Sequence, residues 1–325
     1  KKAAALALGE ITKGGAKRAV VSSRIGEVKE LSIEGGKLTL LRSTFDTNLG
    51  LKALIGDRKG TASVNRLDED SISAAAATAI ELAQASEPDE ANAISEQQTA
   101  AAFSCGIGEP DLDLMYARLE EFLQHVGDTY PHTILEQSIL KFSSGESWFL
   151  NSNGVEFTTK RGHYDFGAMF STKKDGKSSS FNFSGYTADG LDEPLWQKGT
   201  VEELIRQSAE QLDAKPIPEK FVGDIIVTPD ALMSFLGFLT QSVTDFPLIT
   251  GTSAYKDKLG ERVASEKLTI HAAPLSDQIV EKYFVTGDGY PTENCAVVEN
   301  GVLKTFLLSL YGAKKTGGQR APNSG

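Results

Sequence analysis

Apolar residues recur at the spacing of one helix face in several parts of the chain. The clearest stretch is residues 68–86, which begins with acidic residues and Ser71 and continues into an alanine-rich interior. Acidic and hydroxyl side chains stabilise the first turn of a helix, and alanine has the highest helix propensity. Similar patterns predict helices before Gly14-Gly15 and over residues 111–125, 200–213 and 229–242.

Other stretches alternate apolar and polar residues, which is the pattern of half-buried strands. Two of them, residues 28–33 and 37–41, flank Gly35-Gly36 and predict a hairpin. Asn153-Gly154 and Asn300-Gly301 predict two further hairpin turns, because asparagine and glycine tolerate positive φ angles.

A β-rich block follows Pro131. Its predicted strands cover residues 133–141, 146–151, 155–160, 164–171 and 178–184. Phe181 and Phe183 lie on one face of the last strand, and we expect both in the core. Farther along, the apolar run in residues 223–229 predicts a buried strand.

The order of these elements predicts an α+β fold. A chain of 325 residues is long enough for about two domains. Its composition becomes typical of a linker over residues 87–110, and two prolines in residues 215–221 disfavour regular structure. We therefore expect an N-terminal mixed helix and sheet segment with its linker (1–110), a middle β-rich segment (111–214) and a β-rich C-terminal domain (215–325). The last domain is expected to be incomplete, because the chain stops in loop-like residues.

Charge and composition narrow the classes of partner. The chain has 33 Lys and Arg against 44 Asp and Glu, a net charge of −11, which repels phosphate backbones and disfavours nucleic acid as a partner. No apolar run approaches the roughly 18 residues that a membrane span needs. Cys105 and Cys295 are far apart in sequence and suit unpaired thiols in a reducing compartment. These features predict a cytoplasmic protein.

Familiar catalytic motifs are absent from the sequence. The four histidines are His125, His132, His163 and His271, and none lies within five residues of another, which excludes HExxH and HxH metal sites. A metal site assembled from distant histidines stays open. The segments GTSAY at 251–255 and DGKSSS at 175–180 lack the glycines of a nucleophile elbow and of a phosphate loop, respectively.

The last part of the chain carries a more specific signal. KLGERVASEKLTI begins with Lys258, Leu259, Gly260 and Glu261 and contains Ser265 and Glu266; it is followed by the turn at 289–292 and by VENGVLKTFLL, which contains Asn300 and Gly301. Together these segments resemble the C-terminal domain of the TldD/PmbA family. This family is known under the name modulator of DNA gyrase and as peptide-maturation proteases.

The resemblance also implies where a metal site would be. TldD-like members carry HExxxH on a helix before this region; the histidines bind zinc and the glutamate acts as general base. Counting back from KLGER, Leu236 and Gln241 replace the two histidines and Gly237 replaces the glutamate. The resemblance therefore implies no catalytic or metal-binding residue and no cofactor in this chain, with zinc only in a TldD-like partner.

This pattern is similar to the PmbA/TldE branch of the family. It implies a non-catalytic partner subunit in a peptide-processing complex, acting on unfolded or peptide substrates. The partner would be a TldD-like homologue in a heterodimer, or a second copy in a homodimer. Two alternatives stay open: a metallopeptidase with unrecognised ligands, and a binding or scaffold protein that uses the fold for protein contacts.

The helix at 229–242 adds one structural expectation. Leu232, Phe235, Leu236 and Leu239 follow the spacing of a buried stripe. We therefore expect this helix to pack through these four side chains.

Overall fold

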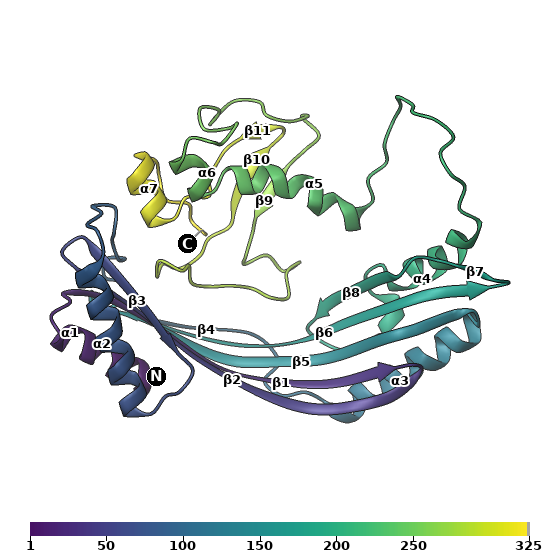
Figure 1. Ribbon diagram of the computed structural model, residues 1–325, viewed down its shortest axis with the longest axis horizontal. Helices are drawn as coiled ribbons and strands as arrows, with labels where there is room; N and C mark the ends of the chain where they lie inside the picture. The colour runs from purple at the N-terminus through teal and green to yellow at the C-terminus, as the bar shows by residue number, and fades with distance from the viewer. Residues whose placement is uncertain (324–325) are drawn as a thin grey trace.

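One long, curved sheet dominates the molecule (Figure 1). The computed structural model describes residues 1–323, apart from the side chain of Asp230. The eight-stranded sheet has the order β3-β2-β1-β5-β6-β4, with β7 and β8 also paired to β6, and only β4 and β6 run parallel. Its strands are β1 (Arg18–Glu34), β2 (Lys37–Ile55), β3 (Arg58–Val64), β4 (Ala101–Gly106), β5 (Thr133–Asn151), β6 (Glu156–Lys174), β7 (Lys177–Ser178) and β8 (Asn182–Ala188). The molecule is α+β, as the sequence predicted.

The strands are longer than the sequence indicated. β5 and β6 pair from Thr133 and Thr172 at one end to Leu150 and Glu156 at the other, so the predicted breaks near residues 142–145 and 161–163 are wrong. Serine and glycine lower strand propensity there, but β1 and β6 lie on either side of β5 and bond its backbone, which overrides propensity. The predicted linker at 87–110 likewise contains β4.

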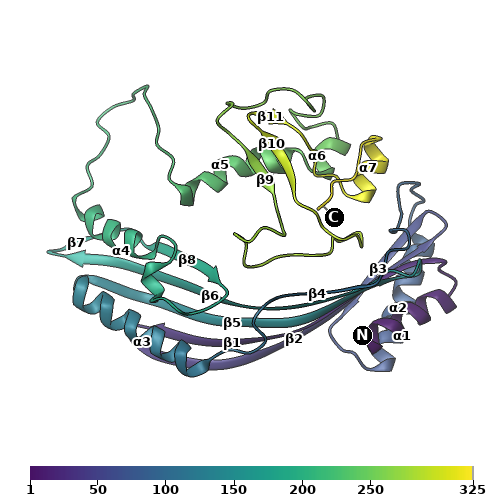
Figure 2. The same ribbon diagram turned by 180° about the vertical axis from the view of Figure 1, so that it is seen from behind.

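The convex face of the sheet is covered along part of its length by α3 (Leu112–Thr129), as Figure 2 shows from behind. Phe122 of α3 meets Phe166 of β6 edge to face, with ring centroids 5.1 Å apart. Phe142 is buried beside them, and α4 (Val201–Glu210) completes the cluster with Val201 and Ile205. Burying a phenylalanine side chain contributes about 2 to 3 kcal/mol, so this cluster holds the α3 side of the sheet.

The other end of the sheet packs against α1 (Lys2–Lys13) and α2 (Glu69–Ala85). The alanine run of α2 lies directly on β3: a Cβ placed on Gly60 would be 2.0 Å from the Ala79 carbonyl oxygen. Small side chains on both elements permit this close approach. The prediction of a helix over residues 68–86 is confirmed within a residue at each end.

The C-terminal region, residues 229–323, lies over the concave face of the sheet (Figure 1). It contains a three-stranded sheet of order β11-β10-β9 and three helices. Their bounds are α5 (Pro229–Ser242), α6 (Asp245–Ile249), β9 (Ile270–Ala272), β10 (Cys295–Glu299), β11 (Val302–Leu303) and α7 (Leu310–Thr316). No helix among residues 1–323 has the length and apolarity to cross a bilayer.

The predicted domain divisions stay predictions. The large sheet takes strands from both 1–110 and 111–214, since β4 pairs with β6. The third segment, 215–325, ends two residues outside the described part of the chain.

The β10–β11 hairpin has the predicted turn and is clamped by a preceding segment. Asn300 and Gly301 have φ angles of 49° and 78°. The Gly301 amide donates to the Leu268 carbonyl at 2.9 Å, and the Gly301 carbonyl accepts from the Val263 amide at 2.8 Å. A Cβ on Gly301 would lie 2.4 Å from the Ala264 carbonyl oxygen, so the clamp requires glycine.

Only the end of α5 is buried, so the predicted stripe is wrong over the first half of the helix. Leu239 is 8% exposed and packs on the hairpin with Val243, and Leu236 is half-buried. Leu232 and Phe235 are 40% and 65% exposed. The spacing identifies an apolar face, but burial also needs an opposing element, and the hairpin reaches only the second half of α5 (Figure 1).

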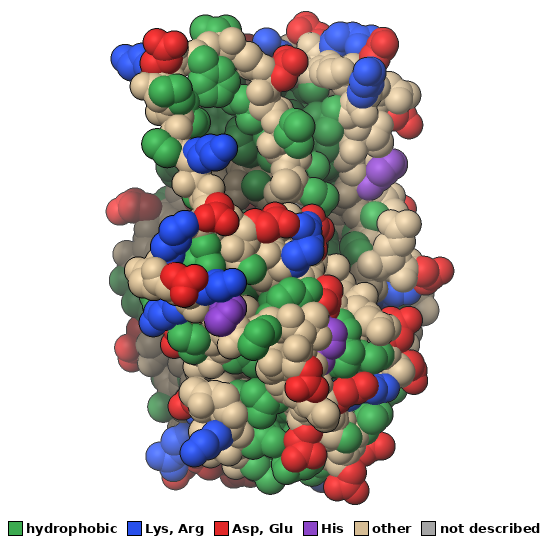
Figure 3. Space-filling model, turned by 90° about the vertical axis from the view of Figure 1, so that its right-hand side faces the viewer, with side chains coloured by type: hydrophobic (Ala, Val, Ile, Leu, Met, Phe, Trp, Pro, Cys, Tyr) green, Lys and Arg blue, Asp and Glu red, His purple; other side chains and the backbone are tan. Residues whose placement is uncertain are grey.

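Residues 223–229, predicted as a buried strand, are irregular up to the start of α5 and exposed except for the half-buried Val227. No described strand lies alongside to bond their backbone. Phe181 and Phe183, expected in the core, are 71% and 69% exposed. Figure 3 views the molecule from the end at which α4 and β7 lie, and it shows apolar side chains around a recess in the upper half of this view. Large apolar side chains are thus exposed in and around α5, among them Phe221, Met233 and Phe238.

Gly301→Ala tests the hairpin clamp. We expect it to lower the free energy of unfolding by about 2 to 3 kcal/mol, because alanine is strained at a positive φ and its Cβ meets the Ala264 carbonyl. Gly237→Ala in α5 is the matched control: its Cβ would have open space, and alanine favours a helix by about 0.5 to 1 kcal/mol. Urea unfolding measures both. Equal stability of Gly301→Ala and the parent would contradict the clamp.

Candidate functional site

The polar face of the large sheet is its concave face. Strand register places Arg24 of β1, Ser147 of β5 and Thr159 of β6 in one row across the sheet. Side chains alternate between the faces of a strand, so Arg161 and His163 share this face. Their neighbours in sequence turn to the opposite face, where Tyr164 and Phe166 belong to the core.

The C-terminal region converts this face into a trough. A cavity of about 190 Å³ is lined by Arg24, Arg161 and His163, among others. A second cavity, of about 230 Å³, shares Arg24 and Arg161 and has residues 285–287 as its opposite wall. A third, of about 660 Å³, continues from Gly287 along Lys52 and Asp288. We call this set of cavities, between the concave face and residues 281–288, the trough.

Polar contacts hold the C-terminal region against the N-terminal half. The Tyr290 hydroxyl donates to Glu96 Oε2 at 2.6 Å, and the Tyr311 hydroxyl donates to Asp89 Oδ2 at 2.8 Å. Lys315 Nζ lies 2.8 Å from the same Asp89 oxygen. The hydrogen bond from Lys315, with those from the Ala91 amide and Tyr311, lowers the pKa of Asp89 to about 2.

Further along the trough, burial shifts the pKa values of Lys52 and Asp288 in the directions that favour their neutral forms. It lowers the pKa of Lys52, although the charge of Asp288 opposes this effect. It raises the pKa of Asp288, although the carboxylate accepts a hydrogen bond from the Leu310 amide. The attraction between Lys52 and Asp288 thus offsets only part of the cost of burying the two charges.

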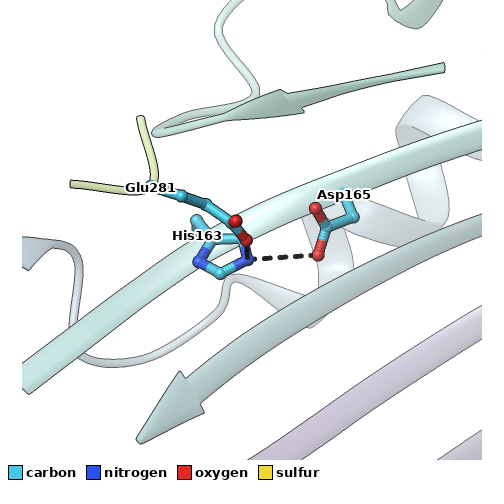
Figure 4. A group of neighbouring side chains, drawn as sticks. All are labelled: His163, Asp165 and Glu281. Carbon is cyan, nitrogen blue, oxygen red and sulfur yellow. Dashed lines mark ion pairs between the residues drawn. The ribbon is translucent and has the colours of Figure 1, made fainter. Parts of the chain in front are cut away.

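His163 lies between two carboxylates, as Figure 4 shows. Its Nε2 is 3.2 Å from Asp165 Oδ2 and 2.6 Å from Glu281 Oε1. Asp165 also accepts from Thr187 and Ser143 at 3.0 and 3.3 Å. Because His163 and Asp165 come from β6 and Glu281 comes from the C-terminal region, the histidine joins the sheet to the far wall of the trough.

The charges explain the protonation of this histidine. The hydrogen bond to Asp165 raises the pKa of His163 above its ordinary value of 6.5; burial opposes the shift, while the charges of Asp165 and Glu281 add to it. A protonated His163 carries one positive charge, which offsets part of the charge of the two carboxylates. The three ligand atoms also lie within 4.8 Å of one another, so they could instead bind a divalent cation; within residues 1–323 no other such group of His, Cys, Asp or Glu occurs.

Comparison with known proteins identifies the family. The model described as the PmbA/TldA metallopeptidase C-terminal domain matches residues 221–325, and the model for domain 1 of the same metallopeptidases matches residues 19–83. The chain belongs to the PmbA/TldD family.

Individual relatives agree with this assignment. A metalloprotease PmbA homologue from Haemophilus influenzae is 23% identical over 94% of this chain and 68% of its own length. A metalloprotease from Methanocaldococcus jannaschii is 24% identical over 87% of this chain and 64% of its own length. The chain therefore spans about two thirds of the length of these curated relatives.

Solved structures share the fold. TldE from Thermococcus kodakarensis has a TM-score of 0.78 at 17% identity and covers 97% of this chain and 72% of its own. A protein from Bacteroides thetaiotaomicron that carries the name of a DNA gyrase modulator has a TM-score of 0.72 at 21% identity, over 99% of this chain and 75% of its own. These likenesses show the PmbA/TldD fold.

The residues expected from the sequence at the family's metal positions do not fit a zinc ion. Leu236 is half-buried, Gln241 is exposed, and a Cβ on Gly237 would have no atom within 4 Å. Leucine and glycine offer no ligand atom, and a glutamine amide does not bind zinc as imidazole does. None of the three lines the trough cavities.

The signature residues of the PmbA/TldD segment support the hairpin. The Gly260 amide donates to the Leu303 carbonyl at 2.8 Å, and the Leu303 amide donates to the Glu261 carbonyl at 3.0 Å. The Ser265 carbonyl accepts from the Leu268 amide at 2.9 Å. The others lie around the same clamp, with Lys258 and Leu259 before it, Glu266 opposite Arg262, and Asn300 and Gly301 at the turn. The structure thus assigns the signature a supporting role and places none of its residues in the trough lining.

Sequence reasoning missed the residues that line the trough. His163 and Asp165 are two apart on a strand, a spacing that puts both side chains on one face and is a local signal for this pair. Glu281 lies more than a hundred positions away in an irregular segment, and no local pattern links it to them.

The histidine contacts predict a pH dependence. We expect the His163 pKa, measured by NMR titration, to lie above 6.5 and to fall in Asp165→Asn and in Glu281→Gln. Because the folded-state pKa is raised, its stabilising effect is complete below about pH 6.5 and is lost as the pH rises through the folded-state pKa. Asp175→Asn, at the exposed β6–β7 turn, should leave the titration unchanged. A His163 pKa at or below 6.5 in the parent would contradict the arrangement.

Proposed function

We propose that the chain is the non-catalytic partner subunit of a peptide-processing complex with a TldD-like homologue that carries HExxxH. The observation that carries the proposal is a pairing of two features. The family's metal positions hold Leu236, Gly237 and Gln241, which do not fit zinc, while the same chain has a polar trough across its concave face. Cleavage chemistry then belongs to the homologue, and peptide binding is shared.

The trough suits an extended polypeptide. Its floor offers hydroxyl and amide side chains, such as Asn48, Ser147 and Thr159, that can bond a peptide backbone. Its far wall comes from residues 281–288, so a bound chain would lie between two parts of the fold. An unfolded segment presents unpaired backbone groups along its whole length, which is the chemistry this floor recognises.

The exposed face of α5 suits the contact with another subunit. Phe235 and Phe238 are 65% and 70% exposed, and Met233 is 70% exposed. Clusters of aromatic and methionine side chains are enriched in protein interfaces. The proposed partner is the TldD-like homologue, with a second copy of this chain as the other occupant. A cytoplasmic location is part of the proposal.

A second function has one observation in its favour. His163, Asp165 and Glu281 supply one nitrogen and two oxygen ligand atoms close together, as many hydrolytic metal centres do. A metal ion there would make the chain a metallopeptidase in its own right, with ligands outside the family motif. The lysine- and arginine-lined trough beside the cluster would then hold the substrate.

Metal content separates the two functions. We expect the purified chain, dialysed against zinc and then against buffer, to hold far less than one equivalent by mass spectrometry, because the Nε2 of a protonated His163 faces the two acids and has no lone pair to offer a metal ion. One equivalent of zinc in the parent that is lost in His163→Ala would contradict the partner-subunit proposal and support the second function. Leu236→Ala serves as the control, and its metal content should equal that of the parent.

Association with the homologue tests the interface. We expect Phe235→Ser with Phe238→Ser to weaken binding to an HExxxH-bearing homologue at least about tenfold, because aromatic anchors dominate interface affinity. Phe45→Ser is the matched control, since Phe45 is 74% exposed on β2 and should leave the affinity unchanged. Sedimentation or surface plasmon resonance gives the dissociation constants. If the double variant and Phe45→Ser bind the homologue with equal affinity, α5 is not part of the interface. If the parent chain does not bind the homologue, the heterodimer is contradicted.

Cleavage assays test the shared activity. The homologue and this chain together should cut an unfolded polypeptide faster than the homologue alone, and this chain alone should not cut it. A rate that is unchanged by adding this chain would contradict the proposal.

A further inference from the structure

Two arginines in the trough lack any partner in the described chain. Arg24 and Arg161 make no hydrogen bond, ion pair or ring contact within residues 1–323, and Arg161 Nε is buried without an acceptor. Every other arginine in this range contacts a carboxylate, a backbone carbonyl or an aromatic ring, as Arg18 does with Asp57. The exposed Arg24 guanidinium is solvated without a protein partner, whereas the buried Arg161 Nε lacks any acceptor among these residues, although acids are plentiful in a chain of net charge −11.

Strand register brings the two arginines to neighbouring rows of the same face. Arg24 lies across from Ser147, and Arg161 lies across from Gly145, which in turn faces Gly26 on β1. The next two positions of this row on the β5 side of Arg161 are therefore glycines, and neither places a side chain beside its guanidinium; Cys105 of β4 lies on the other side. The cavity of about 190 Å³ occupies this place.

The acids that line the cavity already have cationic partners. Glu281 contacts His163 at 2.6 Å, and Glu146 contacts Lys160 at 3.9 Å. Four cationic groups of this cluster, Arg24, Arg161, Lys160 and a protonated His163, face three acids, Glu146, Asp165 and Glu281, so one positive charge is left over. The hydroxyls of Ser147 and Thr159 stand beside the guanidinium groups as further donors.

We propose that Arg24 and Arg161 form a recognition site for a carboxylate of the bound peptide. This inference rests on the proposed peptide-binding function and adds a preference for acidic substrates. Arginine binds carboxylates through two parallel hydrogen bonds, and the missing acceptor for Arg161 Nε is the kind of group that a carboxylate oxygen supplies. The carboxylate comes from an aspartate or glutamate side chain or from a free C-terminus.

Three labelled peptides of one neutral host sequence test the site. The first carries a single Glu and an amidated end, the second replaces that Glu by Gln, and the third is the Gln peptide with a free C-terminal carboxylate. Fluorescence anisotropy with the whole chain gives each dissociation constant. We expect the Glu peptide, the free-carboxylate peptide or both to bind about tenfold more tightly than the neutral one. The peptide that gains affinity identifies the source of the carboxylate.

Variants of the two arginines test whether they cause the preference for a carboxylate. Arg24→Gln, at an exposed position, should keep the fold and lose most of the tenfold preference. Arg161→Lys keeps the charge but loses the planar fork, so it should retain only part of the preference. Arg206→Gln is the control, because Arg206 pairs with Glu210 on α4 and does not line the trough; it should bind all three peptides as the parent does.

The outcomes separate this inference from the proposed function. Equal affinity of the parent for all three peptides would overturn the carboxylate site and leave peptide binding standing. Retention of the full preference in both Arg24→Gln and Arg161→Lys would also overturn it. Failure of the parent to bind any of the peptides, even at millimolar concentration, would overturn the inference together with the peptide-binding function on which it rests.

Discussion

The pairing register of β1, β5 and β6 determines what the concave face can do. Along β6, residues Thr159, Arg161, His163 and Asp165 all point to one side because side chains alternate. A slip by one residue would exchange Arg161 and His163 for Gly162 and Tyr164 and would expose the aromatic core. The buried cluster around Phe122 and Phe142 therefore fixes the register, and the register fixes the polar face.

The polar face of the sheet can enclose a ligand only where another part of the chain lies opposite it. Tyr290 and Tyr311 bond acids of the 87–96 segment, and Glu281 bonds His163. These contacts hold residues 281–288 across the sheet and create the trough. The hairpin clamp at Gly301 joins β10 and β11 to residues 260–268 of the same C-terminal region. The same molecule can thus keep the fold of a metallopeptidase family while its α5 positions offer no zinc ligands.

Local patterns in the sequence were sufficient for several elements. The alanine-rich helix at 68–86 and the Asn300-Gly301 turn were predicted because their determinants lie within a few residues. Local patterns gave wrong predictions where contacts between distant segments determine the structure. β5 continues through Ser143–Gly145 because strands flank it, while Phe235 stays exposed because no described element covers it. The site was beyond local reasoning for the same reason, since it joins β6 to Glu281 through tertiary contacts alone.

The proposed function requires a peptide to lie in the trough. A peptide that carries one photoreactive benzophenone side chain, cross-linked to the whole chain and mapped by mass spectrometry, tests it most directly. We expect cross-links on β1, β5 and β6 around Arg24, Ser147 and Arg161, and on residues 281–288 opposite them. Cross-links confined to α5, or to the helices on the convex side of the sheet, would contradict it.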